Sequence, residues 1–280
     1  MRLHVIIKLG RNSFMRDNET IEELIQKLQK EKRALLKWIL AKASMLKEAV
    51  ALEAKYLYLF GKALDEEFQV AICIQKNKRM LDLYQKAYEK EEYPKSEEIE
   101  SKVEEEFFHF HSKRQEMLEN LDFAIFFMNL EAVPMDIKQE IDKQYKLLLQ
   151  KLHPDLWWET SEKQQELYSL LQRAFDTNDI ELIHHVKEQA KRIKIREEYL
   201  QNPKVVADWI NVLSKKQEEL QDQVEFIKHS FPLNQKKILD DPAKVKSVLL
   251  EIKQATEMNQ VKNRVLEEEL EKIQPAKTLQ

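Results

Sequence analysis

The chain has very little glycine and one cysteine, and each shortage excludes a class of protein. Only 2 of its 280 residues are glycine, where average usage of about 7% predicts on the order of 20. Rossmann and P-loop folds need several glycines close together at their phosphate loops, so the sequence argues against both. The single cysteine, Cys73, rules out an intramolecular disulfide and a multi-cysteine zinc site. Its place between two isoleucines predicts an inert apolar position.

Long apolar runs are missing as well. No stretch approaches the roughly 18 consecutive apolar residues that a membrane-spanning helix needs. The opening MRLHVII is interrupted by His4 and is too short for the core of a signal peptide. We therefore expect a cytoplasmic protein that does not enter the membrane.

What the chain has in abundance is charge. Charged residues make up 34% of the sequence, and a dominance of Glu, Lys, Gln and Leu is typical of long amphipathic or coiled-coil helices. The predicted fold class is therefore all-α. Residues 1–60 carry 12 basic and 7 acidic side chains, and residues 91–135 carry 4 and 12. This asymmetry predicts that the acidic segment folds back antiparallel on the basic one. The sequence has no basic patch with interleaved aromatic residues, so we do not expect it to bind nucleic acid.

The order of the predicted helices follows from apolar periodicity and prolines. Residues 1–18 form a tail without helical period, and an amphipathic pattern then persists to Tyr93-Pro94. One helix of that length would exceed about 100 Å, so we expect a fold-back at Ala43-Ser44 or at Phe60-Gly61, and the sequence does not choose between them. A further helix is predicted from Ser96 to Leu130.

Prolines also mark the helices of the second half. A helix is expected over residues 136–152, and another begins near Ser161. Asn202-Pro203 and Asp241-Pro242 combine an N-cap residue with proline at the first helical position. They predict two helices within residues 203–274, forming a C-terminal helical hairpin.

One segment looks like a functional site. In the helix 136–152 the apolar residues fall on one stripe, whereas Lys143 and Lys146 face away. The stripe consists of Ile141, Tyr145, Leu148 and Leu152. Pro154 cannot continue a helix and disfavours helix at the residue before it, so His153-Pro154-Asp155 forms a loop. The next helix has a matching stripe of Leu167, Leu170, Leu171, Ala174 and Phe175.

Two antiparallel helices with a His-Pro-Asp loop at their tip resemble the J-domain of DnaJ-type co-chaperones. The resemblance extends to Tyr145, eight residues before the histidine, to Ile141 and Lys151, and to the Ala174-Phe175 pair. It covers residues 120–186, about a quarter of the chain. The implied organisation is a tail (1–18), a helical coiled-coil arm (19–119), this module (120–186) and the C-terminal hairpin (187–280). The basic face of the family's second helix is thinned here, with Asp142 and Leu147 at positions where Lys or Arg is common.

The resemblance implies a co-chaperone that stimulates a DnaK-type chaperone ATPase and is not itself an enzyme. By resemblance, Asp155 engages a basic residue of that ATPase, Pro154 fixes the loop and His153 holds or contacts the partner. Lys143, Lys146 and Lys151 supply electrostatic steering. No catalytic residue, cofactor or metal is expected. The arms would bind an unidentified client and are candidates for pairing two copies of the chain. The alternative is a coiled-coil scaffold or assembly protein in which a degenerate J-fold serves packing.

Three further groups of residues are weaker candidates for a functional site. Glu105 and His109 share a helix face, but His109 and His111 point to nearly opposite sides, so a metal site is not favoured. The phenylalanines of this region are expected to form core: Phe107, Phe108, Phe110, Phe123, Phe126 and Phe127. At least one ring of Trp157-Trp158 is expected to pack over neighbouring helices rather than act as a binding anchor.

Overall fold

The computed structural model describes residues 20–273, and within this range it contains helices and no strand. The all-α prediction is confirmed. The predicted tail of residues 1–18 lies outside the described residues. No helix of residues 20–273 has the length and apolarity to cross a membrane. The helices are α1 (Ile21–Tyr88), α2 (Ser96–Glu106), α3 (Phe108–Asn129), α4 (Met135–Leu152), α5 (Glu162–Asp176), α6 (Ile180–Ala190), α7 (Pro203–His229), α8 (Lys236–Leu239) and α9 (Pro242–Ile273), with short 3-10 turns η1 (Pro154–Leu156), η2 (Glu198–Gln201) and η3 (Leu233–Gln235).

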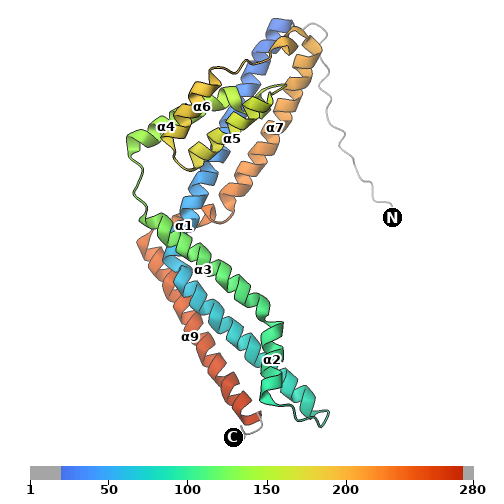
Figure 1. The fold of residues 1–280 in the computed structure, drawn as a ribbon, viewed down its shortest axis with the longest axis vertical. Helices are drawn as coiled ribbons and strands as arrows, with labels where there is room; N and C mark the ends of the chain where they lie inside the picture. Colours follow the sequence, from blue (N-terminus) through green and yellow to red (C-terminus); the bar gives the residue numbers. More distant parts are fainter. Residues whose placement is uncertain (1–19, 274–280) are drawn as a thin grey trace, which may run out of the picture. The chain divides into compact units, whose positions relative to one another are not determined.

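The described residues divide into two compact units (Figure 1). The first contains residues 20–44 and 133–225, and the second contains residues 45–132 and 226–273. Both α1 and α7 pass from one unit into the other. The segment 120–186, which resembles a J-domain, is divided between the units at residue 132. The division of the chain into four parts (1–18, 19–119, 120–186 and 187–280) stays a prediction.

Helix α1 is continuous, and the expected fold-back within it was wrong. A reciprocal cap starts the helix: the Glu23 amide donates to Thr20 Oγ1 at 3.3 Å, and the Thr20 amide donates to Glu23 Oε2 at 2.9 Å. The helix then runs for 68 residues through both candidate bends. It contains no proline, and Gly61 serves close packing instead of a turn. A Cβ atom at Gly61 would lie 2.8 Å from Cδ1 of Leu121 in α3.

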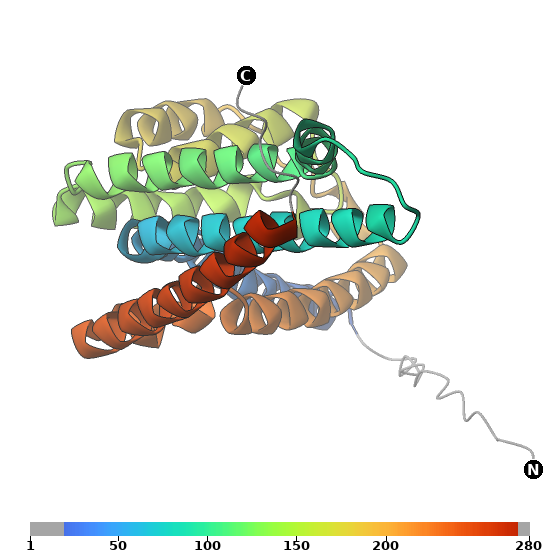
Figure 2. The same ribbon diagram turned by 90° about the horizontal axis from the view of Figure 1, so that it is seen from below.

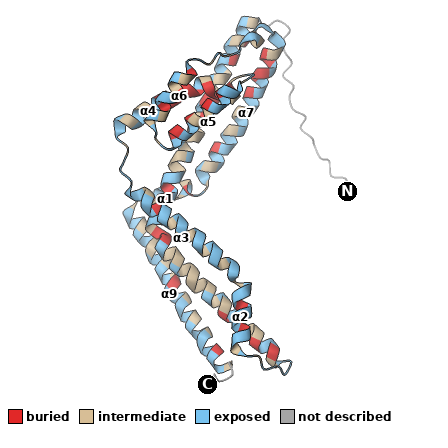
Figure 3. Cartoon of the chain, in the orientation of Figure 1, coloured by how far each residue is buried: buried red, intermediate tan, exposed pale blue. Residues whose placement is uncertain are grey.

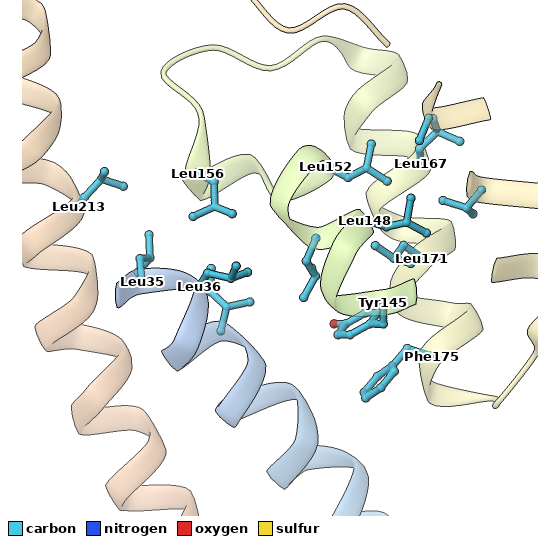
Figure 4. Close-up of a cluster of buried hydrophobic side chains, with 14 of the residues drawn as sticks. Leu35, Leu36, Tyr145, Leu148, Leu152, Leu156, Leu167, Leu171, Phe175 and Leu213 are labelled. Carbon is cyan, nitrogen blue, oxygen red and sulfur yellow. The ribbon is translucent and has the colours of Figure 1, made fainter. Parts of the chain in front are cut away.

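The first unit has one hydrophobic core, built by five helices. Helices α4, α5 and α6 contact one another, and they pack on the first part of α1 and on α7 (Figure 4). Ile141, Leu149 and Leu152 of α4 are completely buried, as is Leu35 of α1. The predicted stripe of α4 is therefore confirmed as core, and it gains cover from α1 and α7 that the local pattern could not reveal.

In the second unit the later part of α1 lies between α3 and α9 (Figures 1 and 2). The acidic segment does run antiparallel along α1, with Arg79 paired to Glu106 at 2.7 Å and Asp65 to Arg114 at 2.8 Å. The α1 residues of these two pairs lie beyond the predicted partner 1–60, because the turn after Tyr88 returns the chain beside the residues it has just left. The single helix expected from Ser96 to Leu130 is interrupted at Phe107.

The phenylalanines of α3 correct a second expectation. Phe108, Phe123 and Phe126 are 68%, 55% and 62% exposed, so the aromatic cluster is not a common core. Figure 3 shows α3 as largely exposed along its length. Only the narrow side with Ala124 is buried, and Phe126 lies about 200° around the helix from it, since each residue turns the helix by about 100°.

The predicted N-caps of the C-terminal helices are confirmed. Asn202 Oδ1 accepts from the Lys204 amide at 3.1 Å, and Asp241 Oδ1 accepts from the Ala243 amide at 3.0 Å. Each proline occupies the first helical position, where no backbone N–H is needed. Helix α8 lies between the two predicted helices.

Candidate functional site

The His-Pro-Asp loop lies at the tip of an antiparallel pair of helices, α4 and α5. Far from the tip, the rings of Tyr145 and Phe175 stack with centroids 3.9 Å apart. Near the tip, Gln164 Nε2 donates to the carbonyl oxygen of Lys151 at 2.9 Å. Ser161 caps α5, and its Oγ accepts from the Gln164 amide at 3.2 Å. The loop therefore lies on two helices that contact each other both near the tip and far from it.

The loop has a defined backbone conformation of its own. The His153 amide still donates to the carbonyl of Leu149 at 2.9 Å, as the last hydrogen bond of α4. His153 then becomes extended, with φ −63° and ψ 123°, as expected for a residue before proline. Pro154 begins the turn η1, which the Leu156 amide closes on the carbonyl of His153 at 3.1 Å.

His153 is a buried, structural member of the loop. Its side chain is 7% exposed, and its Nδ1 atom accepts from the Asp155 amide at 3.1 Å. The ring meets Tyr168 of α5 edge-on, with centroids 4.7 Å apart. Burial lowers the pKa of His153 from 6.5 to about 4; Lys216 also lowers it, and Asp155 opposes this shift. The histidine is therefore neutral at pH 7, and the Asp155 bond assigns its proton to Nε2.

Asp155 is half-exposed and already has a partner inside the chain. Its Oδ1 atom forms an ion pair with Nζ of Lys216 in α7, and the two side chains are 36% and 34% exposed. The next residue of α7, Gln217, donates from Nε2 to Oε2 of Glu31 in α1 at 2.6 Å. The loop carboxylate therefore contacts α7 and is only partly exposed to solvent.

The residues after the loop pack into the first unit. Leu156 is 3% exposed and belongs to the same core as Leu35 and Leu213 (Figure 4). Trp157 lies under Nζ of Lys32, 3.8 Å from the ring centroid. The ring of Trp158 meets that of Trp209 at 5.5 Å. The packing interpretation of the two tryptophans is confirmed.

Lys32 is the most perturbed cation beside the loop. Its Nζ donates to the hydroxyl of Tyr199 at 3.1 Å. Burial lowers its pKa from 10.5 to about 8, an effect that Glu197 partly opposes. Lys32 thus joins the Trp157 ring to α1 on this side of the loop.

The predicted steering lysines lie along the outer side of α4. Lys143 and Lys146 are exposed on adjacent turns, and Lys151 is half-buried near the tip. Nζ of Lys143 is 3.9 Å from Glu140 Oε2. The structure thus brings His153, Pro154 and Asp155 together in one turn and sets the lysines beside them on one helix.

The sequence did not reveal the residues that cover this turn. Lys216 follows Asp155 by 61 positions, and Lys32 belongs to the distant start of the chain. No local spacing links them to the loop. Tyr168 is the one covering residue named above that local spacing could have indicated, because it lies on α5 between the apolar positions 167 and 170/171.

The other candidates gain nothing from the structure. His111 Nε2 is 3.0 Å from Glu104 Oε1, and no group of three or more metal-ligating side chains occurs among residues 20–273. Cys73 is exposed, which corrects its expected apolar position; neighbours in sequence on a helix face different directions.

Comparison of the chain with protein-family models, with curated proteins and with solved structures found no match.

Proposed function

We propose that the chain is a J-domain co-chaperone that stimulates a DnaK-type chaperone ATPase through His153-Pro154-Asp155. The observation that carries the proposal is the His-Pro-Asp turn at the tip of the antiparallel α4–α5 pair, with its backbone bonded as described above. The stripes that resemble the family's core positions are buried on the inner sides of both helices. The cytoplasm is the expected compartment, since DnaK-type partners act there.

In this proposal each loop residue has a separate task. Pro154 restricts the backbone, and His153 accepts the Asp155 N–H so that the carboxylate keeps one direction. The Asp155 carboxylate pairs with a basic residue of the ATPase and favours its hydrolysing conformation. Such coupling between sites is typically about 1–3 kcal/mol. The exposed Lys143 and Lys146 raise the rate of encounter with an acidic partner surface.

The chemistry itself belongs to the partner. No residue of this chain needs to act as acid, base or nucleophile, and no cofactor or metal enters the proposal. The helical arms would bring the ATPase to a client protein. They are also candidates for pairing between copies of the chain, whereas neither nucleic acid nor membrane is a proposed partner.

The test is a steady-state ATPase assay of a purified DnaK-type chaperone with the full chain. We expect the wild-type chain to accelerate hydrolysis and Asp155→Asn to remove the acceleration. The matched control is Asp142→Asn, which removes the same charge from an exposed position of α4 and should leave the stimulation intact. Equal stimulation by the Asp155 variant and the wild-type chain would remove the loop from the mechanism.

A second candidate function is a helical scaffold with a degenerate J-fold. It is favoured by the Asp155–Lys216 ion pair and by the burial of Leu156, because both bind the loop into the chain's own core. On this account the wild-type chain does not stimulate the ATPase at any concentration. Asp155→Asn then has at most a small effect on thermal stability.

A further inference from the structure

The Asp155–Lys216 ion pair occupies the charge on which the proposed function depends. Lys216 presents an ammonium group to the carboxylate that would meet a basic residue of the ATPase. A carboxylate already paired with a cation attracts a second cation less strongly. Lys216 is therefore a competitor for the partner's basic residue, supplied by the same chain.

The loop does not need this ion pair for its own conformation. The bonds that shape it run from the Asp155 amide to His153, from Gln164 to Lys151 and within η1. Leu156 anchors the end of the turn in the core. Removal of the Lys216 side chain therefore uncovers Asp155 without removing any of the contacts that hold the turn.

Helix α7 is anchored on both sides of Lys216. On its N-terminal side, Val206, Ile210 and Leu213 are buried in the core of the first unit. Beyond Lys216, Leu220 packs against the same core and Val224 is 3% exposed, beside polar contacts of Gln217 with Glu31 at 2.6 Å and of Lys42 Nζ with Gln223 Oε1 at 2.8 Å. The Lys216 side chain itself is 34% exposed, so it can turn away from Asp155 while α7 stays in place.

We propose that Lys216 is an autoinhibitory latch that keeps Asp155 covered until a partner displaces it. This proposal rests on the proposed function and adds its regulation. In the latched state His153, Pro154 and Asp155 are already in their binding conformation, and only the carboxylate is occupied. Displacement requires a cation that pairs with Asp155 better than Lys216 does, so that the Lys216 side chain turns away from the loop.

The latch is weak because both of its side chains are partly exposed to solvent. A half-exposed ion pair of this kind changes an equilibrium constant by about 1.5- to 5-fold. A partner with several contacts can overcome such a factor, so the latch adjusts the concentration at which the chain acts and does not prevent its action.

The latch can be tested first on the chain alone. Carbodiimide coupling of glycine ethyl ester to carboxylates, followed by mass spectrometry, measures how accessible each acid is. We expect Lys216→Ala to raise the labelling rate of Asp155 about 1.5- to 5-fold, relative to the exposed Asp142 in the same molecule. Lys215→Ala is the matched control, since Lys215 is exposed on the same turn of α7. An unchanged Asp155 rate in Lys216→Ala overturns the latch.

The ATPase assay then separates the latch from the function on which it rests. Lys216→Ala should reach half-maximal stimulation at about 1.5- to 5-fold lower concentration than the wild-type chain. The concentration of Lys215→Ala at half-maximal stimulation should equal that of the wild-type chain. The corresponding concentration of Lys216→Arg should be no lower than the wild-type value. Adding Asp155→Asn should abolish stimulation in every background.

Two failures have different meanings in these assays. Stimulation that depends on Asp155 but is equal in Lys216→Ala and wild type overturns the latch and leaves the proposed function standing. Absence of stimulation by all variants, Lys216→Ala included, overturns the proposed function and the latch with it. A wild-type chain that needs about 1.5- to 5-fold more protein than Lys216→Ala for half-maximal stimulation supports both.

Discussion

The two units of the chain hold their helices together in different ways. The first unit has one continuous core that joins five helices. The buried residues of the second unit form two smaller clusters: Leu81, Tyr84, Ile99 and Leu270, and Leu52, Phe60 and Leu239. The candidate loop belongs to the unit with the continuous core. A recognition turn is held in one geometry best where its supports are close-packed.

Polar contacts have a larger share in the second unit. Asn77 of α1 is 8% exposed and donates from Nδ2 to Asn263 Oδ1 of α9 at 2.9 Å. Arg114 makes two bonds to Asp65, of 2.8 and 3.1 Å. Arg114 is 39% exposed, and ion pairs with an exposed member contribute little to stability. Substitutions at these polar contacts should therefore cost less than substitutions in the continuous core of the first unit, whereas buried residues of the second unit such as Phe60 remain sensitive.

The largest expected effect is on an aromatic ring in the core of the first unit. Phe175 is 4% exposed and stacks on Tyr145, so Phe175→Ala should lower the free energy of unfolding by about 3–5 kcal/mol. Phe126→Ala, at a residue 62% exposed in the second unit, should change it by about 0.5 kcal/mol or less. Urea unfolding followed by circular dichroism compares the two. Equal losses would contradict the contrast between the core of the first unit and the exposed face of α3.

Acid should weaken the first unit through His153. Its pKa of about 4 in the folded chain lies below the ordinary value of 6.5, so the unfolded chain binds a proton that the folded chain excludes. The free energy of unfolding should therefore fall as the pH drops from about 6.5 to 4, by about 3 kcal/mol at most, and this contribution is constant above that window. His153→Gln should remove this part of the pH dependence. A variant with the wild-type pH profile would exclude His153 as its source.

The smallest expected effect concerns the second unit. Arg114 is paired with Asp65, whose pKa is lowered chiefly by the hydrogen bond from that guanidinium. Because the arginine is partly exposed, Arg114→Ala should cost about 1 kcal/mol or less, and the cost should shrink at high salt. Thermal melts at low and high sodium chloride measure both. A loss that is large and independent of salt would mean that the ion pair matters more than the buried residues of this unit.

The sequence predicts best what depends on neighbouring residues. The buried stripe of α4, the N-caps at Asn202 and Asp241, and the loop at Pro154 all follow from local spacing and backbone chemistry. These features agree with the structure because a proline or a capping side chain acts on its own turn.

Long-range packing was the part that could not be predicted. Leu121 packs closely on Gly61 in the continuous α1, and a glycine within a helix looks the same in sequence whether it bends or packs. The cover of the loop by Lys216 depends on where α7 lies, and no periodicity in α4 or α5 contains that information. The exposed phenylalanines of α3 show the same limit, since composition does not say which helix faces find partners.

A hydrogen-exchange footprint of the full chain with an ATP-loaded DnaK-type chaperone shows whether the His-Pro-Asp loop is the contact with the ATPase. We expect slowed exchange over residues 143–157 of the first unit, with no slowing over α3 or α9 of the second, and loss of the footprint in Asp155→Asn. Protection confined to the second unit, or an identical footprint with Asp155→Asn, would contradict the proposed contact.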